Sequence, residues 1–144
     1  MGLLRSATRA TNAELREDVD ALQVAVDAGA FVTAAASDET TAITTGVGKV
    51  TFRMVGTRIL TGVRASLSVA QTSGSTFTVD INKNGSTILS TKITIDNNEK
   101  TSVTAAAQAV LSTSVISDDD EISIDVDQIG NGTAKGLKVS LIWG

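Results

Sequence analysis

The sequence predicts an all-β fold, an antiparallel β-sandwich or jelly-roll-like domain preceded by a short N-terminal helix. Apolar and polar residues alternate along most of the chain after residue 40, and Gly, Asn and Asp mark turns between the alternating runs. About eight strands with a turn every 8 to 12 residues or so are typical of sandwiches, jelly rolls and related barrels. Aromatic residues make up only 3% of the chain, so the core must be built from Val, Ile, Leu and Ala.

Residues 1–9 form a short arm that is both apolar and basic. The candidate attachment residues of this arm are Leu3, Leu4, Arg5 and Arg9. One interpretation is a flexible tail. The other is a peptide that docks on a partner through the two leucines and the two arginines. The residues alone leave both open.

Residues 11–28 carry a helical pattern. Thr11 and Glu14 fit a capping box, and Gly29 provides a stop. A two-heptad apolar seam follows, and its members, the candidate oligomerisation residues, are Leu15, Val19, Leu22 and Val26. Such a helix either lies against the β-domain of its own chain or forms a short bundle or stalk around a symmetry axis. Its position before an all-β domain favours the bundle, so residues 1–30 are predicted to serve attachment and oligomerisation.

Residues 31–39 are expected to form a linker, which Phe31 could anchor, and residues 40–144 the β-domain. The first strands are expected at 40–45, 49–54 and 58–70. Gly62 lies inside the third of these runs and predicts a bulge or bend there.

Residues 76–95 predict a β-hairpin. Phe77, Val79 and Ile81 alternate with polar residues, and a second alternating run follows Asn84-Gly85. Asn and Gly tolerate the positive φ angles of a type I′ turn, so this dipeptide is a strong hairpin signal.

Two further strands are predicted in the C-terminal part, at 121–128 and 137–143, and tight turns at 96–99 and 117–120. Residues 101–115 are ambiguous, because an alanine-rich run inside them has helical propensity. The β-branched flanks and the β-rich context favour a strand or a pair of strands.

Composition excludes several classes of function. Without Cys and His, the chain has no thiolate nucleophile, no Cys-based metal site and no His general base. A net charge of −4, one Trp and three Phe argue against a nucleic-acid partner. No apolar run approaches the roughly 20 residues of a membrane span, and no signal peptide is visible. We expect a protein that folds in the cytoplasm, without a cofactor and without enzymatic activity.

The opening of the hairpin resembles the first half of a calcium loop. Asp80, Asn82, Asn84 and Gly85 fit the spacing, but Thr91 stands where the bidentate Glu belongs. Because the hairpin turn already explains Asn84 and Gly85, we expect no metal here.

Two other acidic features contain carboxylates that could bind a cation or act on a sugar. Residues 118–121 are four consecutive acids, which could form a weak cation site but are expected to be a solvated turn. Asp125 and Asp127 share one strand face, as a hydrolytic carboxylate pair could, yet aromatic sugar platforms are missing. No catalytic or metal-binding residue is therefore predicted.

Several strand and turn segments resemble β-modules of tailed-bacteriophage virion proteins. The segments are LTGVRASL at 60–67, FTVDIN at 77–82, ILSTKITID at 88–96, IDVDQIG at 124–130 and TAKGLKV at 133–139. The likeness covers roughly residues 46–144 and transfers no functional residue, because the matching motifs are scaffold. It leaves residues 1–30 outside.

The resemblance implies a non-enzymatic virion protein of the head decoration (cement) or head-fibre-like type, usually a homotrimer. A capsid decoration protein would bind the major capsid protein on the outer surface of the head and stabilise the shell. The alternative is a tail- or head-fibre module, a receptor-binding tip that recognises the host surface. The short chain suits a complete decoration subunit better than a long fibre.

Overall fold

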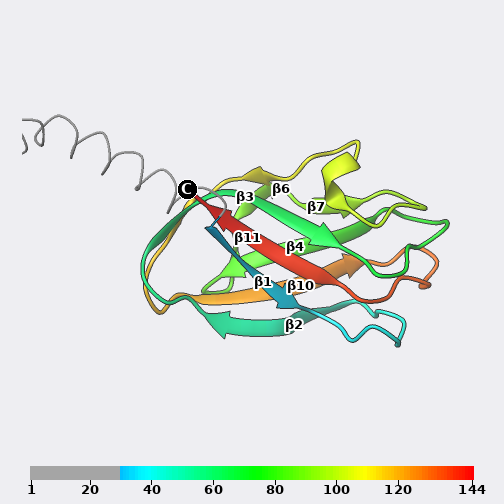
Figure 1. Cartoon of the computed structure of the whole chain (residues 1–144), viewed down its shortest axis with the longest axis horizontal. Coiled ribbons are helices and arrows are strands. Elements are labelled where there is room, and N and C mark those ends of the chain that lie inside the picture. Colours follow the sequence, from blue (N-terminus) through cyan, green and yellow to red (C-terminus); the bar gives the residue numbers. More distant parts are fainter. Residues whose placement is uncertain (1–29) are drawn as a thin grey trace, which may run out of the picture.

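Two antiparallel sheets lie face to face across an aliphatic core in the computed structural model, which describes residues 30–144 (Figure 1). The first sheet has the order β1 (Ala30–Ala35), β11 (Lys138–Trp143), β3 (Arg58–Ser66) and β9 (Val115–Ile116). The second sheet has the order β2 (Gly46–Arg53), β10 (Glu121–Gln128), β4 (Phe77–Lys83) and β5 (Ser86–Thr87), with β7 (Ile93–Ile95) also paired to β4. A small pair consists of β6 (Leu89–Thr91) and β8 (Val110–Leu111). The all-β, sandwich-like prediction is confirmed for this part of the chain.

The core follows the alternation seen in the sequence. In β10, Ile122, Ile124 and Val126 are buried, whereas Asp125 and Asp127 lie on the outer face. Because side chains alternate between the two faces of a strand, each sheet turns one aliphatic face inward. The largest side chains that are fully buried are Phe77, Ile81, Ile88, Ile93, Ile95, Ile116, Ile122, Ile124, Leu137 and Leu141.

The predicted hairpin turn and bulge are both present. Asn82 pairs with Thr87, and the intervening turn has φ angles of 49° at Asn84 and 84° at Gly85, as a type I′ turn requires. In β3, Gly62 pairs with Ile142 and the register then shifts, which places the expected bulge at this glycine.

The start of the β-domain differs from the prediction. The expected linker at 31–39 contains β1, which pairs with β11 along its whole length, and the strand expected at 40–45 is absent. In that segment Asp38 accepts hydrogen bonds from the backbone N–H groups of Thr40 (2.7 Å) and Thr41 (2.6 Å). This side chain therefore stabilises a local turn in place of a strand ladder.

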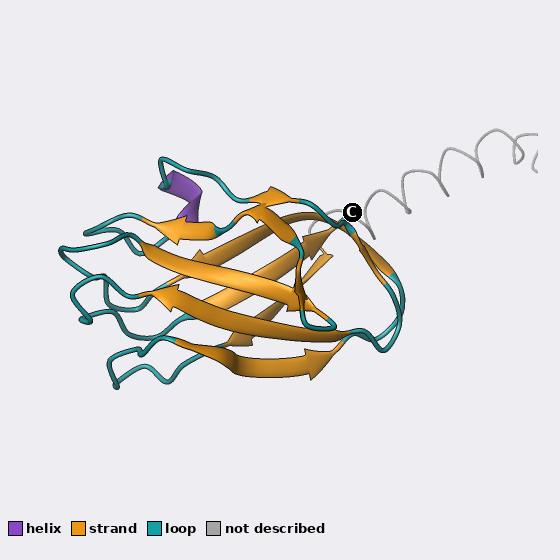
Figure 2. Cartoon of the chain, turned by 180° about the vertical axis from the view of Figure 1, so that it is seen from behind, coloured by secondary structure: helices purple, strands orange, loops and turns teal. Residues whose placement is uncertain are grey.

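Two further segments contain shorter strands than the alternation in the sequence predicts. The second half of the hairpin divides into β5, β6 and β7, because β6 leaves β4 to pair with β8. Residues 101–115, expected to form a strand or a pair of strands, begin with a 3₁₀ turn, η1 (Ser102–Thr104), and continue with the short strand β8 and the start of the short strand β9. Figure 2 shows this turn as the one helical element within residues 30–144. The predicted N-terminal helix lies outside the described residues and stays a prediction.

The described chain begins and ends at one end of the sandwich. Ala30, the first residue of β1, pairs with Trp143, the last residue of β11 (Figure 1). We call this the terminal end. It also carries the loop at 54–57, the hairpin turn and the acidic turn, while the loops at 36–45, 67–76 and 129–137 lie at the opposite, distal end (Figure 1).

Candidate functional site

The site residues proposed from the sequence all lie outside the described part of the chain. These are the attachment candidates Leu3, Leu4, Arg5 and Arg9 and the oligomerisation candidates Leu15, Val19, Leu22 and Val26. The structure does show where the segment that carries them joins the domain. It joins at the terminal end, because β1 starts there at Ala30. Surfaces around this junction are therefore candidate functional surfaces.

The acidic turn lies at the terminal end and its carboxylates bond to neighbouring protein groups. Asp118 accepts a hydrogen bond from the backbone N–H of Gly56 (2.6 Å), and Asp120 accepts one from the Asn84 side-chain amide (2.8 Å). The Asn84 bond is the main reason why the pKa of Asp120 is lowered, with the Ser117 N–H contributing next. These hydrogen bonds connect the acidic turn to the loop at 54–57 and to the hairpin turn. No group of three acidic, His or Cys side chains placed to hold a metal ion occurs within residues 30–144.

The polar residues of the hairpin form a network on the outer face of the second sheet. Asn82 donates to Asp125 (2.8 Å), and Lys92 forms ion pairs with Asp80 and Asp127. The hydrogen bond to Asp127 is the largest cause of the raised pKa of Lys92. Asp80, the first residue of the calcium-like pattern, thus pairs with a protein side chain, as buried polar groups in folded proteins usually do.

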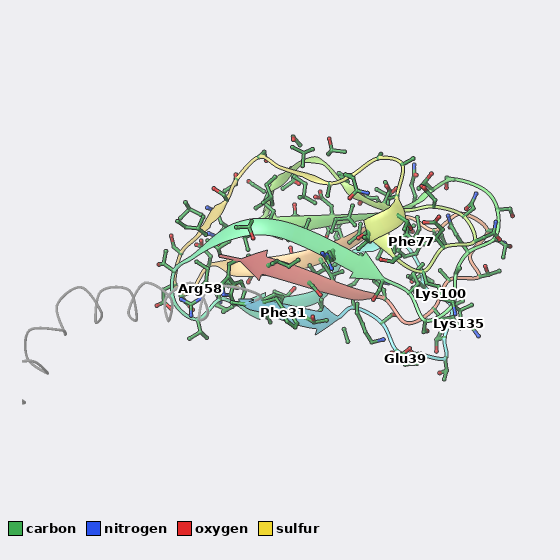
Figure 3. All side chains as sticks on the ribbon, turned by 45° about the horizontal axis from the view of Figure 1, so that its top comes forward. Phe31, Glu39, Arg58, Phe77, Lys100 and Lys135 are labelled. Atoms are coloured by element: carbon green, nitrogen blue, oxygen red, sulfur yellow. The ribbon has the colours of Figure 1, made fainter. Side chains whose placement is uncertain are left out.

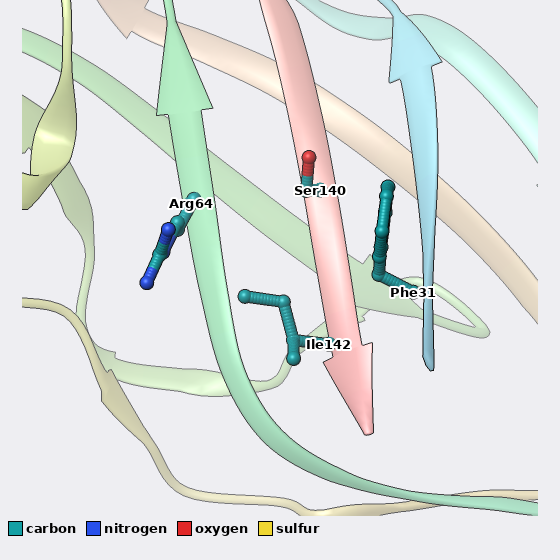
Figure 4. Close-up of a pocket in the computed structure, with 4 residues that line it drawn as sticks. All are labelled: Phe31, Arg64, Ser140 and Ile142. Carbon is teal, nitrogen blue, oxygen red and sulfur yellow. The ribbon is translucent and has the colours of Figure 1, made fainter. Parts of the chain in front are cut away.

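The outer face of the first sheet is different. Phe31 on β1, Arg64 on β3, and Ser140 and Ile142 on β11 line a shallow hollow of about 290 Å³ (Figure 4). Phe31 is 61% exposed although it is the largest apolar side chain on its strand. The register places Phe31, Ile142 and Gly62 in one row across the three strands. We call this surface the apolar face.

Sequence reasoning missed the apolar face. The pattern places Phe31 in a linker and does not distinguish Ile142 from its neighbours in the last strand. A signal is present, because Phe31-Val32 and Leu141-Ile142-Trp143 are consecutive apolar residues within strands. Since successive side chains point to opposite faces, such runs require an apolar residue on the outer face.

A second exposed apolar pair lies at the terminal end. Ile59 pairs with Val115 across β3 and β9, and both side chains are about half exposed. The Arg58 guanidinium lies 5.7 Å from the centroid of the Trp143 ring, within range of a cation–π interaction. Figure 3 shows Arg58 and Phe31 toward this end, and Glu39, Lys100 and Lys135 at the distal end.

Neither a family model nor a curated protein matches the chain. Within residues 30–144, no helix is long and apolar enough to cross a membrane.

Proposed function

We propose that the chain is a non-enzymatic virion protein of a tailed bacteriophage, a homotrimeric capsid decoration (cement) protein. It binds the major capsid protein on the outer surface of the head and stabilises the shell. The resemblance of residues 46–144 to phage virion modules supports this proposal.

The strand order supports the jelly-roll part of the proposal. Successive long strands alternate between the sheets, with β1, β3 and β11 in the first and β2, β4 and β10 in the second. If β5 to β7 count as one edge strand, each sheet has four strands, and eight strands in two sheets are the architecture of a jelly roll. This is a fold that displays loops at both ends of a rigid scaffold.

The observation that carries the proposal is that the first residue of β1 and the last residue of β11 lie side by side at the terminal end. The attachment segment joins β1 at the terminal end, next to the last strand. The distal loops are thus held away from the junction by the full length of the strands. A module anchored through residues 1–29 would lie with its terminal end toward the shell and project the rest outward.

The charges of the N-terminal segment fit docking on a protein surface. Leu3 and Leu4 offer apolar area, and burying such area stabilises a complex by roughly 25 cal/mol per Å² before ordering costs. Arg5 and Arg9 can pair with carboxylates at the rim of such a contact, where they guide orientation and association rate more than affinity.

Binding to capsids that lack the protein tests the arm. The full chain with Leu3→Asp and Leu4→Asp is compared with wild type and with Val47→Asp, a change at an exposed side chain of β2. In a co-sedimentation assay we expect the double variant to lose at least about tenfold in affinity, since two buried apolar contacts are worth more than about 1.4 kcal/mol. The Val47 variant should bind as wild type does. Equal binding by all three proteins would refute attachment through the arm.

A further inference from the structure

The apolar face lies on the outer side of the first sheet, and its apolar residues are concentrated near the terminal end. Its rows across β1, β11 and β3 are Phe31–Ile142–Gly62, then Thr33–Ser140–Arg64, then Ala35–Lys138–Ser66. The first row contains no polar side chain and lies next to the terminal end. Among the atoms of residues 30–144, a Cβ placed on Gly62 would meet none within 4 Å.

The outer face of the second sheet shows what a solvated face of this protein looks like. There Asn82 bonds to Asp125, Lys92 lies between Asp80 and Asp127, and Arg53 lies 3.5 Å from Glu121. These groups satisfy one another and need no partner molecule. On the apolar face, Thr33 and Ser140 of the second row share a hydrogen bond (2.8 Å), and Lys138 of the third row pairs with Glu39. The Phe31–Ile142–Gly62 row has no polar side chain to form such contacts, and within residues 30–144 Arg64 makes no ion pair.

The length of the preceding segment limits what can lie over the first row. Phe31 follows Val26, the last residue of the predicted seam, by five positions. A fully extended chain of that length spans at most about 18 Å. If the helices of several copies form a bundle, the starts of their β1 strands are held close to one axis. The surface nearest to the start of β1 is the Phe31–Ile142–Gly62 row.

We infer that the apolar face binds a second copy of this chain, with Phe31 as its central contact. This rests on the self-association that the proposed function includes. Copies held by short N-terminal segments meet at high effective concentration, so even a small apolar contact becomes occupied. Phe31 and Ile142 supply the apolar centre, and aromatic side chains in such positions dominate interface energetics. Arg64 and Lys138 lie farther along the face, where they form a polar rim.

Cross-linking tests this inference in the full chain. The protein has no Cys, so Phe31→Cys carries a single thiol, and Val47→Cys is the matched control. Val47 lies on edge strand β2 of the other sheet and is 84% exposed, more than Phe31, so random collisions would favour the control. With a short bismaleimide, the Phe31→Cys protein should form covalent dimers at least about tenfold faster. Thermal unfolding shows that both variants fold, and light scattering gives the mass of the uncross-linked protein.

Two results would overturn the inference. An oligomer in which Val47→Cys cross-links as fast as Phe31→Cys would place the contact elsewhere. A monomeric Phe31→Cys protein whose thiol resists a small monofunctional maleimide would show that residues 1–29 of the same chain cover the face. Failure of the proposed function is distinguishable, because fast cross-linking of the Phe31→Cys protein together with no capsid binding would leave the interface intact and remove the decoration role.

Discussion

Gly130 occupies one of the tightest backbone positions in the described part of the molecule. Its φ angle is 58°, and a Cβ there would overlap the buried Gln71 side chain and lie 2.7 Å from the carbonyl oxygen of Ser73. Gln71 in turn donates to the Ser75 carbonyl (2.8 Å) and to Asn97 (2.7 Å). This glycine thus lets three distal loops pack against one buried amide.

Alanine substitutions at two glycines should separate backbone strain from overpacking. Gly85 also has a positive φ angle, but a Cβ there meets no atom of residues 30–144 within 4 Å. We expect Gly85→Ala to lower the free energy of unfolding by about 1–2 kcal/mol, the cost of the left-handed conformation. Gly130→Ala should cost a further 1–3 kcal/mol or so through overpacking. Urea unfolding of both variants measures the difference, and equal losses would show that the contact with Gln71 is unimportant.

Asp38 makes the stability of the fold depend on pH. Backbone N–H groups of Thr41 and Thr40 bond its carboxylate and lower its pKa to about 2. Because the pKa of Asp38 is lower in the folded state than its unfolded value of about 3.9, the ionised carboxylate stabilises the fold at pH values above that unfolded pKa. This stabilisation is lost as the pH falls toward the folded pKa of about 2.

Asp38→Asn should therefore weaken the response of the protein to acid. Its amide oxygen can still accept the two backbone bonds, but the group no longer titrates. We expect the melting temperature of the variant to fall less than that of wild type between about pH 5 and pH 2. Thermal unfolding by circular dichroism across this range measures the effect, and an identical fall in both proteins would contradict it.

At the scale of elements, Lys92 joins the hairpin to the neighbouring strand. It lies between Asp80 on β4 and Asp127 on β10, and the Asp80 side chain is only 8% exposed. Asp80 also accepts a 2.5 Å hydrogen bond from Thr87. Removing the lysine would leave the two carboxylates without their shared counter-charge.

Lys92→Met should lower the free energy of unfolding by about 1–3 kcal/mol, since a largely buried carboxylate loses a charged partner. Lys138→Met breaks a pair with Glu39 in which both side chains are well exposed, and it should cost clearly less. Adding Asp80→Asn to Lys92→Met should recover part of the loss in a double-mutant cycle followed by urea unfolding. A Lys92→Met loss no larger than that of Lys138→Met would mean that the network is solvated.

The sequence predicts elements well where alternation is long and turn chemistry is specific. β10, β4 and the Asn84-Gly85 turn are as expected, because each is defined by local side-chain periodicity. β1 and residues 101–115 are not, since their structure depends on pairing with distant strands. Phe31 on β1 belongs to a surface completed by Ile142, 111 positions away in the chain, which local patterns cannot reveal.

At the scale of the molecule, the sandwich has two unlike sheets and two unlike ends. The second sheet is covered by mutually bonded polar side chains, and the first presents the apolar face next to the junction with residues 1–29. This asymmetry suits a subunit that self-associates at the terminal end and exposes the distal loops.

The position and copy number of the protein in the virion test the central claim most directly. Cryo-electron microscopy of the particles, with antibody labelling of the β-domain, gives both quantities in one experiment. The decoration proposal predicts many copies distributed over the outer surface of the head, in contact with the major capsid protein. A few copies at the tail would contradict decoration and favour the receptor-binding fibre module, and absence from the particle would contradict a virion role altogether.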